Sequence, residues 1–506
     1  MISLISQVIT GVQANNPVEI DSHELGPVYI AYAGPYSSSP SSAFGHLVLL
    51  LPSSSAEPVP LWDVVTFGAE TFDAGVIRYL GVGIMGGFLG RYQRVPFHEK
   101  TREYALLEDR DLWLVELELT TQERSALDKE LSSVKGYWYP YTFFSKNCAY
   151  YLQSIISRAT GAIPPPKGTV SPIGVLDAVL KSSLAGQSYF RSAESYRLAD
   201  MSEEIPPSVI NRLRKDNWIT VAADTTWLMQ LANTERRFVQ DFFILKSLHE
   251  RSALDERSRA GLSRLRLQNV RESSRQPAVR STAPGVPIPS PRFHEYTRLT
   301  ISYLVNNSED SRVALRIRGA LHDLSEPPLA HRPLNSLELL AVEASVSTEG
   351  ISPRIDELIL FSQRSLSPSS WLVNRNSWML ETIGRYGGLF GADAFHMEMR
   401  AGSGKTYRFL NSGFAYALFT VAGTGTCCKE IALAPGWETG FAWLPNGPWR
   451  AGLRWTREYD ITDWKRNHER IHFFIRRDIT QKWAFNLKGE AGPLGTYARF
   501  GIDWYP

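Results

Sequence analysis

The sequence has little cysteine, almost no excess charge and no long apolar run, and each absence excludes a class of protein. Three cysteines in 506 residues cannot build a disulfide framework, and Cys427 and Cys428 are adjacent in the chain. A net charge of +2 supplies no global field that would attract nucleic acid, so we predict no nucleic-acid partner. No run of about 18 apolar residues occurs, so a membrane-spanning helix is not expected. The isolated thiol of Cys148 remains to be explained.

The overall composition is that of a globular protein. Apolar residues make up 43% of the chain and charged residues 21%, and 506 residues are enough for two or three domains with buried cores. Residues 1–25 form an N-terminal segment that is a poor secretory signal as written, because no Lys or Arg precedes its apolar part.

The first predicted domain covers residues 26–185 and mixes strands with helices. FGHLVLLL is continuously apolar, as expected of a strand buried on both faces, and LWLVELELT alternates like a second strand. In residues 148–159, apolar side chains recur at i, i+4, i+7 and i+8, which predicts a helix. Asn147 is a favourable N-cap, so Cys148 should lie at the positive end of this helix and face the protein.

The rest of the chain predicts three further regions. Residues 186–276 indicate a helical connector that ends in an arginine-rich stretch, and the Pro-rich residues 277–293 indicate a linker. Residues 294–506 contain many short alternating segments separated by turn residues, which predicts a large antiparallel sheet or barrel. The alternation favours an outer-membrane barrel and a soluble barrel or sandwich about equally. The predicted fold class is therefore α+β.

His46 and Cys148 form a candidate catalytic pair. A helix N-terminus stabilises a thiolate, and a neighbouring imidazole can take the thiol proton and later return it to a leaving group. A histidine inside FGHLVLLL is costly to bury unless it has a polar partner. Each residue also has a structural interpretation, as a core cysteine and a hydrogen-bonded core histidine, and the residues alone leave both interpretations open.

Three segments resemble the bacterial Lnb N-terminal periplasmic domain family: YIAYAGPYSSSPSSAFGHLVLLL, GVGIMGGFLGRYQRVPFHEKTREYALLEDRDLWLVEL and YPYTFFSKNCAYYLQSII. The order of a strand histidine and then a helix-start cysteine is also similar to the permuted papain-like fold of the lecithin-retinol acyltransferase group. The resemblance covers roughly residues 26–185 and implies that His46 and Cys148 are the functional pair. Residues 294–506 resemble the β-rich, outer-membrane-type region of some relatives.

The resemblance implies a cysteine-dependent acyltransferase of the bacterial envelope, in the periplasm or outer membrane. The acyl donor would be a phospholipid, the acceptor a lipoprotein N-terminal amine, and the chain would associate with a membrane. Two alternatives stay open. The same pair serves a thiol amidase or peptidase of cell-wall peptides, and a non-catalytic envelope protein could keep both residues for structural reasons.

A third polar group normally orients the histidine of a thiol enzyme. Thr66 and Glu70 lie in the next strand-like segment, and Ser42 and Asn147 flank the two main residues. All four are candidates. We predict no cofactor.

Two short motifs have competing interpretations. HERIH matches a zinc-binding pattern, with His468 and His472 as ligands and Glu469 as base if it lay on a helix, but the aromatic residues that follow favour a strand. AGSGKTYRF contains Gly-Lys-Thr but has Met399 where a phosphate-binding loop needs glycine, so we expect a hairpin turn. We predict neither a metal site nor nucleotide binding.

Overall fold

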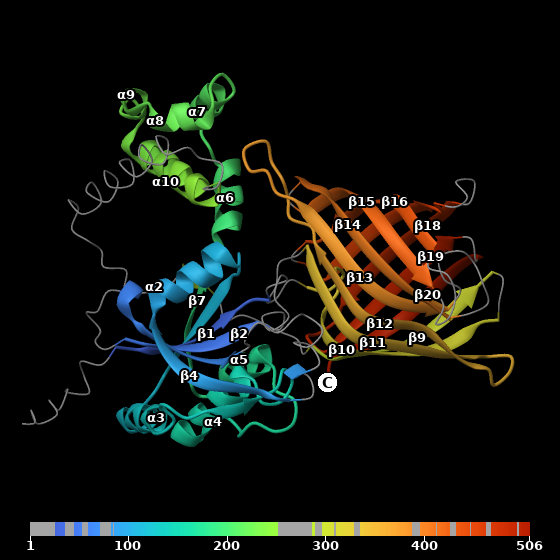
Figure 1. Cartoon of the computed structure of the whole chain (residues 1–506), viewed down its shortest axis with the longest axis horizontal. Coiled ribbons are helices and arrows are strands. Elements are labelled where there is room, and N and C mark those ends of the chain that lie inside the picture. Colours follow the sequence, from blue (N-terminus) through green and yellow to red (C-terminus); the bar gives the residue numbers. More distant parts are fainter. Residues whose placement is uncertain are drawn as a thin grey trace, which may run out of the picture.

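The computed structural model contains an α+β domain, a helical region and a closed barrel (Figure 1). It describes residues 26–35, 45–52, 59–70, 82–83, 86–250, 286–288, 296–307, 310–327, 334–386, 395–410, 412–425, 432–445, 447–461, 467–492 and 495–506. The N-terminal segment, Ser42, Cys427, Cys428 and the arginine-rich end of the connector lie outside these residues. None of the described helices is long and apolar enough to cross a membrane.

The first domain is built on an eight-stranded antiparallel sheet with the order β6-β4-β3-β2-β1-β5-β7-β8. Its strands are β1 (Val28–Ala33), β2 (His46–Leu51), β3 (Asp63–Glu70), β4 (Phe88–Pro96), β5 (Leu112–Leu117), β6 (Tyr139–Tyr141), β7 (Ala185–Arg191) and β8 (Val286–Ile288). The central strands β1, β2 and β5 are buried almost throughout, which explains their continuous apolar character.

Helices cover both faces of this sheet. On one face, α3 (Thr121–Ser133), α4 (Cys148–Thr160) and α5 (Pro172–Leu180) pack on the side chains of Ile30, Leu47 and Leu49. The other face meets η1 (Val59–Leu61), α2 (Phe97–Thr101) and the π-helical segment η2 (Arg102–Leu107). Because successive strand residues point to opposite faces, neighbouring residues of β2 serve the two different cores.

Local sequence explains where the two main helices begin. Thr120 and Glu123 form a reciprocal capping box at the start of α3. The side chain of Asn147 accepts a hydrogen bond from the backbone N–H of Tyr150 at 3.1 Å, and α4 starts at Cys148 as predicted.

The sheet extends beyond the boundary predicted at residue 185. β7 begins at Ala185 and runs into the predicted connector, and β8 lies in the stretch predicted as a linker. The predicted connector and the predicted linker therefore each add a strand to the sheet. After β7 the chain is helical, and these helices share a core of their own that includes Leu198, Val209 and Phe242. The helices are α6 (Glu194–Glu203), α7 (Pro207–Leu213), α8 (Trp218–Ala223), α9 (Thr225–Leu228) and α10 (Asn233–His249).

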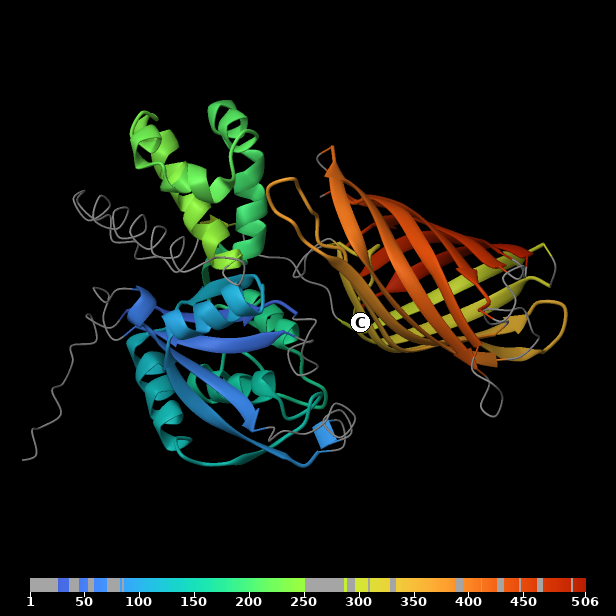
Figure 2. The ribbon, with the colours of Figure 1, turned by 45° about the horizontal axis from the view of Figure 1, so that its top comes forward.

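The C-terminal domain is a closed antiparallel barrel, which decides between the barrel and the sandwich (Figure 2). Its twelve strands run in sequence order, and β20 pairs with β9 to close the ring. They are β9 (Arg298–Asn306), β10 (Arg312–His322), β11 (Asn335–Ser347), β12 (Pro353–Ser365), β13 (Ser377–Tyr386), β14 (Phe395–Phe409), β15 (Gly413–Gly425), β16 (Ala432–Trp443), β17 (Trp449–Tyr459), β18 (Asn467–Asp478), β19 (Trp483–Gly492) and β20 (Gly495–Trp504). The Gly-Lys-Thr segment lies within β14, so the predicted hairpin turn there was wrong.

The barrel is apolar outside and charged inside. Ile301, Tyr303 and Val305 of β9 are exposed, whereas the alternating Arg298, Thr300 and Ser302 are buried. The other strands repeat this pattern. An apolar outer band on an even number of tilted antiparallel strands is typical of outer-membrane barrels and not of soluble ones.

Exposed aromatic side chains gather at one end of the barrel, where β9 begins and β20 ends. They are Tyr407, Phe409, Trp443, Trp449, Trp483 and Trp504, and all lie at strand ends on that side. Aromatic girdles of this kind sit at the interface between hydrocarbon and water.

The first domain packs against this same end of the barrel. The hydroxyl groups of Tyr32 and Tyr296 lie 2.9 Å apart, and Tyr296 and Leu337 belong to the core of the first domain. Arg375, between β12 and β13, donates to Asp109 at 2.7 Å. The first domain is therefore held beside the aromatic girdle.

Candidate functional site

Cys148 is the first residue of α4 and is 3% exposed. Burial raises the pKa of its thiol to about 11, although hydrogen bonds from backbone N–H groups, led by that of Leu47, act in the opposite direction. The ladder between β2 and β3 begins at Val48, so Leu47 lies just outside it on that side. The resting cysteine is therefore a neutral thiol with backbone donors already at its sulfur.

His46 opens β2, and Thr66 of β3 binds its ring. His46 Nε2 and Thr66 Oγ1 lie 2.8 Å apart, and Thr66 is 3% exposed. Burial, together with the positive charges of Arg110 and Lys100, lowers the pKa of His46 to about 3. The imidazole is therefore neutral at ordinary pH and can accept a proton.

The two candidate residues are neighbours without a direct bond. Leu47, which follows His46, donates to the sulfur, but no hydrogen bond joins the imidazole to the thiol in the described part of the chain. Catalytic hydrogen bonds are often long in unliganded enzymes and tighten when the substrate binds. Proton transfer between them would need the ring and the sulfur to approach each other.

The other four sequence candidates have different outcomes. Thr66 contacts His46 and fits the orienting role. Asn147 caps α4, and its amide donates to the carbonyl groups of Phe143 and Val170, so it holds the helix start in place. Glu70 instead forms an ion pair with Arg91 at 2.9 Å. Ser42 lies outside the described residues.

Tyr104 is a site residue that the sequence reasoning missed. Its ring centroid lies 6.1 Å from that of His46, it is 2% exposed, and its hydroxyl has no hydrogen-bond partner among the described residues. Cys148 is near enough for a thiolate there to contribute to the raised pKa of Tyr104, although burial is the main cause. Tyr104 lies on the π-helical η2, a conformation found frequently at functional sites.

Two cations lie against the ring of Tyr104. The guanidinium carbon of Arg110 is 4.9 Å from the ring centroid and Lys100 Nζ is 5.3 Å from it. Arg110 is fixed by Gly34, Ala33 and Glu108, to which it donates at 2.6, 2.9 and 2.8 Å. Sequence spacing does not reveal Tyr104 and its two cations, because η2 lies close to Cys148 only in the folded structure.

Tyr32 supports the strand that carries His46. Gly45 has a φ of +82°, and a Cβ atom at this position would lie 2.4 Å from the Tyr32 ring. Glycine is therefore required at Gly45 both for its backbone conformation and for the close contact. The aromatic ring thus packs directly against Gly45, the residue that precedes β2.

The aromatic stretch before Cys148 is divided between core and surface. Tyr141 and Phe143 are buried in one cluster with Phe67, Tyr151 and Cys148. Tyr137 and Trp138 are 63% and 47% exposed. The part of the stretch nearest the thiol is therefore core.

The histidines of HERIH lie in β18, as the aromatic pattern predicted. His472 Nδ1 lies 3.0 Å from Glu490 Oε2, and the indole of Trp455 donates to Glu469. The described residues contain no group of three potential metal ligands. The helical geometry that the zinc interpretation requires is therefore missing.

The fold and site define a class: a thiol-containing α+β domain attached to an outer-membrane-type barrel. Residues 19–181, which span most of the first domain, match the model of the Lnb N-terminal periplasmic domain. Residues 292–492 match a domain of unknown function (DUF7840). A search of curated proteins gave no match. The chain is therefore a protein of the bacterial envelope, in the periplasm or outer membrane.

Solved structures of outer-membrane proteins match part of this chain at low identity. A KdgM porin in complex with disordered oligogalacturonate is 6% identical, with a TM-score of 0.26, and the match covers 41% of this chain and 98% of that one. The NanC porin is 6% identical over the same shares, with a TM-score of 0.27. The outer membrane protein OmpT of Vibrio cholerae is 7% identical, with a TM-score of 0.21, over 42% of this chain and 98% of that one.

Proposed function

We propose that the protein is a cysteine-dependent acyltransferase that moves an acyl chain from a phospholipid to the N-terminal amine of a lipoprotein. The observation that carries this proposal is the placement of Cys148 at the start of α4, with the Leu47 N–H at its sulfur and the His46–Thr66 pair on the adjacent strands. A neutral imidazole beside a neutral thiol is the starting state that general-base activation requires.

The reaction would proceed in two balanced steps. His46 takes the proton of the Cys148 thiol while sulfur attacks the ester carbonyl carbon, and the C–O bond breaks as the proton passes to the leaving alkoxide. A thioester and a lysophospholipid result. The acceptor amine then attacks the thioester, the C–S bond breaks, and His46 carries the amine proton to the departing sulfur.

Each step develops negative charge on the carbonyl oxygen. The backbone N–H groups of Leu47 and Ala149 at the sulfur are suitable donors to it. The hydroxyl of Tyr104 is a third, because it is buried and has no partner in the described structure. Burial keeps this phenol protonated, and the positive charge of Arg110 opposes the rise in its pKa.

The position of the domain supports a lipid donor over a soluble peptide. The barrel end that contacts the first domain carries the aromatic girdle, so the domain would lie at the membrane surface. Phospholipids of that leaflet would then be the most concentrated esters near Cys148. This placement favours acyl transfer over the amidase or peptidase alternative.

The test uses the full chain in vesicles of phosphatidylethanolamine and phosphatidylglycerol with isotope-labelled acyl chains. We expect the peptide containing Cys148 to carry a labelled acyl group that hydroxylamine releases, seen by mass spectrometry. Cys148→Ala should carry none, and His46→Ala should form it at least about a hundredfold more slowly. A diacylated lipopeptide with a free N-terminal amine should discharge the thioester, whereas its N-acetylated form should not.

Two results would overturn the proposal. One is a wild-type protein that forms no thioester with any diacyl phospholipid. The other is equal turnover of a short water-soluble ester or of a cell-wall peptide, which would indicate a thiol hydrolase.

A further inference from the structure

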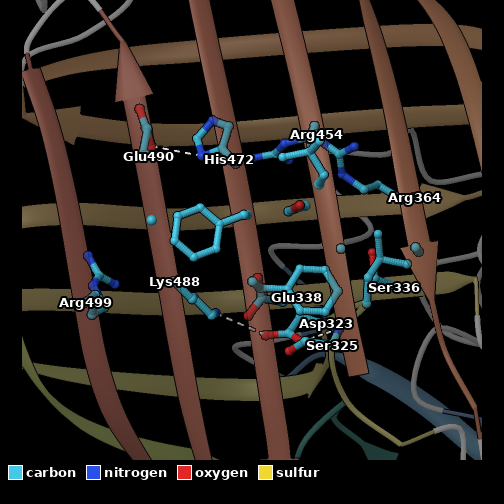
Figure 3. A pocket seen from close by; sticks show the side chains of 18 of the residues that line it. Asp323, Ser325, Ser336, Glu338, Arg364, Arg454, His472, Lys488, Glu490 and Arg499 are labelled. Carbon is cyan, nitrogen blue, oxygen red and sulfur yellow. Dashed lines mark hydrogen bonds and ion pairs between the residues drawn. The ribbon is translucent and has the colours of Figure 1, made fainter. Parts of the chain in front are cut away.

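A cavity of about 240 Å³ lies inside the barrel, far along the chain from the thiol site (Figure 3). Its wall carries six cationic side chains and four carboxylates. The cations are Arg316, Arg364, Arg385, Arg454, Lys488 and Arg499. The cations that line the cavity therefore outnumber the carboxylates that line it.

Five of these six cations have a carboxylate within 4.0 Å. Arg385 and Arg499, for example, lie 3.2 Å from Glu357 and 2.5 Å from Glu343, and Lys488 lies 3.6 Å from Asp323. Arg316 pairs with Glu357, and Arg364 pairs with Glu381 and Glu438. The lumen is thus largely neutralised by its own ion pairs.

Arg454 is the exception among the described residues that line the cavity. It has no ion pair and no hydrogen bond within the described structure, and its Nε atom is buried. Arg454 is only partly buried, so the rest of its guanidinium is open to the cavity. A protein that retains such a group inside a charged lumen gains from a ligand that pairs with it.

The carboxylates that act on Arg454, Glu381 and Glu438, are both already paired with Arg364. In the barrel register its two opposite residues are Gly440 on β16, which has no side chain, and His472 on β18. His472 is already bound to Glu490, as the dashed line in Figure 3 shows. Glu438 accepts from Arg364 and from the hydroxyl of Tyr416.

We propose that this cavity binds a small oxyanion, a phosphate- or carboxylate-bearing molecule, with Arg454 as its principal ligand. A guanidinium presents paired N–H donors that match the oxygens of phosphate and carboxylate. The cavity is smaller than pockets for drug-sized ligands, so the occupant is a single small group. This site is independent of the proposed acyl transfer.

The experiment is calorimetric titration of the full chain in a zwitterionic detergent, with chloride holding the ionic strength constant. The probes are inorganic phosphate, glycerol 3-phosphate and citrate. We expect saturable binding of at least one probe. Glycerol 3-phosphate bound more tightly than phosphate indicates a lipid headgroup as the natural source, and the reverse order indicates a free anion.

The decisive variant is Arg454→Gln, and the matched control is Arg477→Gln. Arg477 lies over the exposed ring of Trp449 at 5.2 Å, on the outside of the barrel. We expect Arg454→Gln to weaken binding at least about tenfold, the loss of one charge-assisted pair, and Arg477→Gln to leave it unchanged. Arg454→Lys, which keeps the charge, should bind with intermediate affinity.

A folding measurement keeps the proposal falsifiable. Because Arg454 has no partner in the described structure, Arg454→Gln should unfold no more easily than the wild type when no probe is present. Absence of binding by all three probes would overturn the proposal. So would equal affinity in wild type and Arg454→Gln, or a marked loss of barrel stability in Arg454→Gln without probe.

Discussion

The two domains bury titratable side chains in opposite ways. At the thiol site, His46, Cys148 and Tyr104 are buried in their neutral forms and contact backbone donors, a threonine hydroxyl and aromatic rings. In the barrel, Arg298 and Arg318 both donate to Glu326 at 2.7 Å, and all three are almost fully buried. The thiol site thus keeps its titratable groups neutral, whereas the barrel lumen pairs most of its buried charges with one another.

The largest effect on stability should come from breaking one of these permanent pairs. Glu326→Gln removes the closest carboxylate of the fully buried Arg318 and leaves Arg298 with Asp323 at 2.9 Å, and we expect a loss of about 3–5 kcal/mol in the free energy of unfolding. Urea unfolding of the barrel in vesicles measures it. The control is Glu469→Gln, whose partner is the exposed indole of Trp455 and which should change stability by less than about 1 kcal/mol. A loss no larger than in the control would remove the contrast between the domains.

Tyr104→Phe tests whether the unpaired hydroxyl serves the reaction. It keeps the ring, so we expect normal folding and a thioester formation rate lower by about a hundredfold, as for loss of one oxyanion donor. Alkylation of Cys148 by iodoacetamide develops no oxyanion and should be unchanged. Tyr92→Phe is the matched control, because the Tyr92 hydroxyl already donates to the Tyr151 carbonyl at 3.0 Å. Equal acylation rates in wild type and Tyr104→Phe would exclude the role.

The alkylation rate of Cys148 against pH tests the neutral resting thiol directly. With a pKa raised to about 11, the thiolate fraction at pH 7.5 should be about a hundredfold lower than for an ordinary thiol. Peptide mass spectrometry separates Cys148 from the other two cysteines. An alkylation profile whose midpoint lies below about pH 8.5 would indicate a preformed thiolate at Cys148. The contrast with the charged lumen would then not hold.

The lowered pKa of His46 predicts that the stability of the first domain depends on pH. Its pKa falls to about 3 on folding, so the folded state binds this proton more weakly than the unfolded chain. Stability from this group is complete above about pH 6.5 and is lost as the pH falls toward 3. The first domain of His46→Asn should therefore lose less stability over that range, measured by near-ultraviolet circular dichroism at fixed urea. An unchanged pH dependence would contradict the buried neutral histidine.

The smallest effect should come from Thr66. Thr66→Val removes the hydroxyl that orients His46, and we expect acylation about tenfold slower with a stability loss of about 1 kcal/mol. Thr66→Ser keeps the hydroxyl and should restore most of the rate. If Thr66→Ser is as slow as Thr66→Val, then packing and not orientation explains the effect.

Local patterns were enough for the parts of the fold that depend on near neighbours. The helix starting at Cys148 follows from the Asn147 cap and the apolar spacing after it, and the barrel strands follow from their alternation. The segment containing Lys405 was misassigned because its glycines favour a turn, yet pairing with β13 and β15 on both sides keeps it in β14. The extension of the first sheet by β8 was missed because the pairing partner β7 lies almost one hundred residues away.

The sequence by itself determined which side chains could do chemistry, because His46, Cys148 and Thr66 all belong to segments with strong local signals. Only the tertiary structure decided how they work. It selected Thr66 over Glu70, brought Tyr104 beside the thiol, closed the barrel and left Arg454 unpaired within the described lumen. The physical reason is that pKa values, ion pairing and burial depend on contacts between residues distant in the chain, which no local pattern encodes.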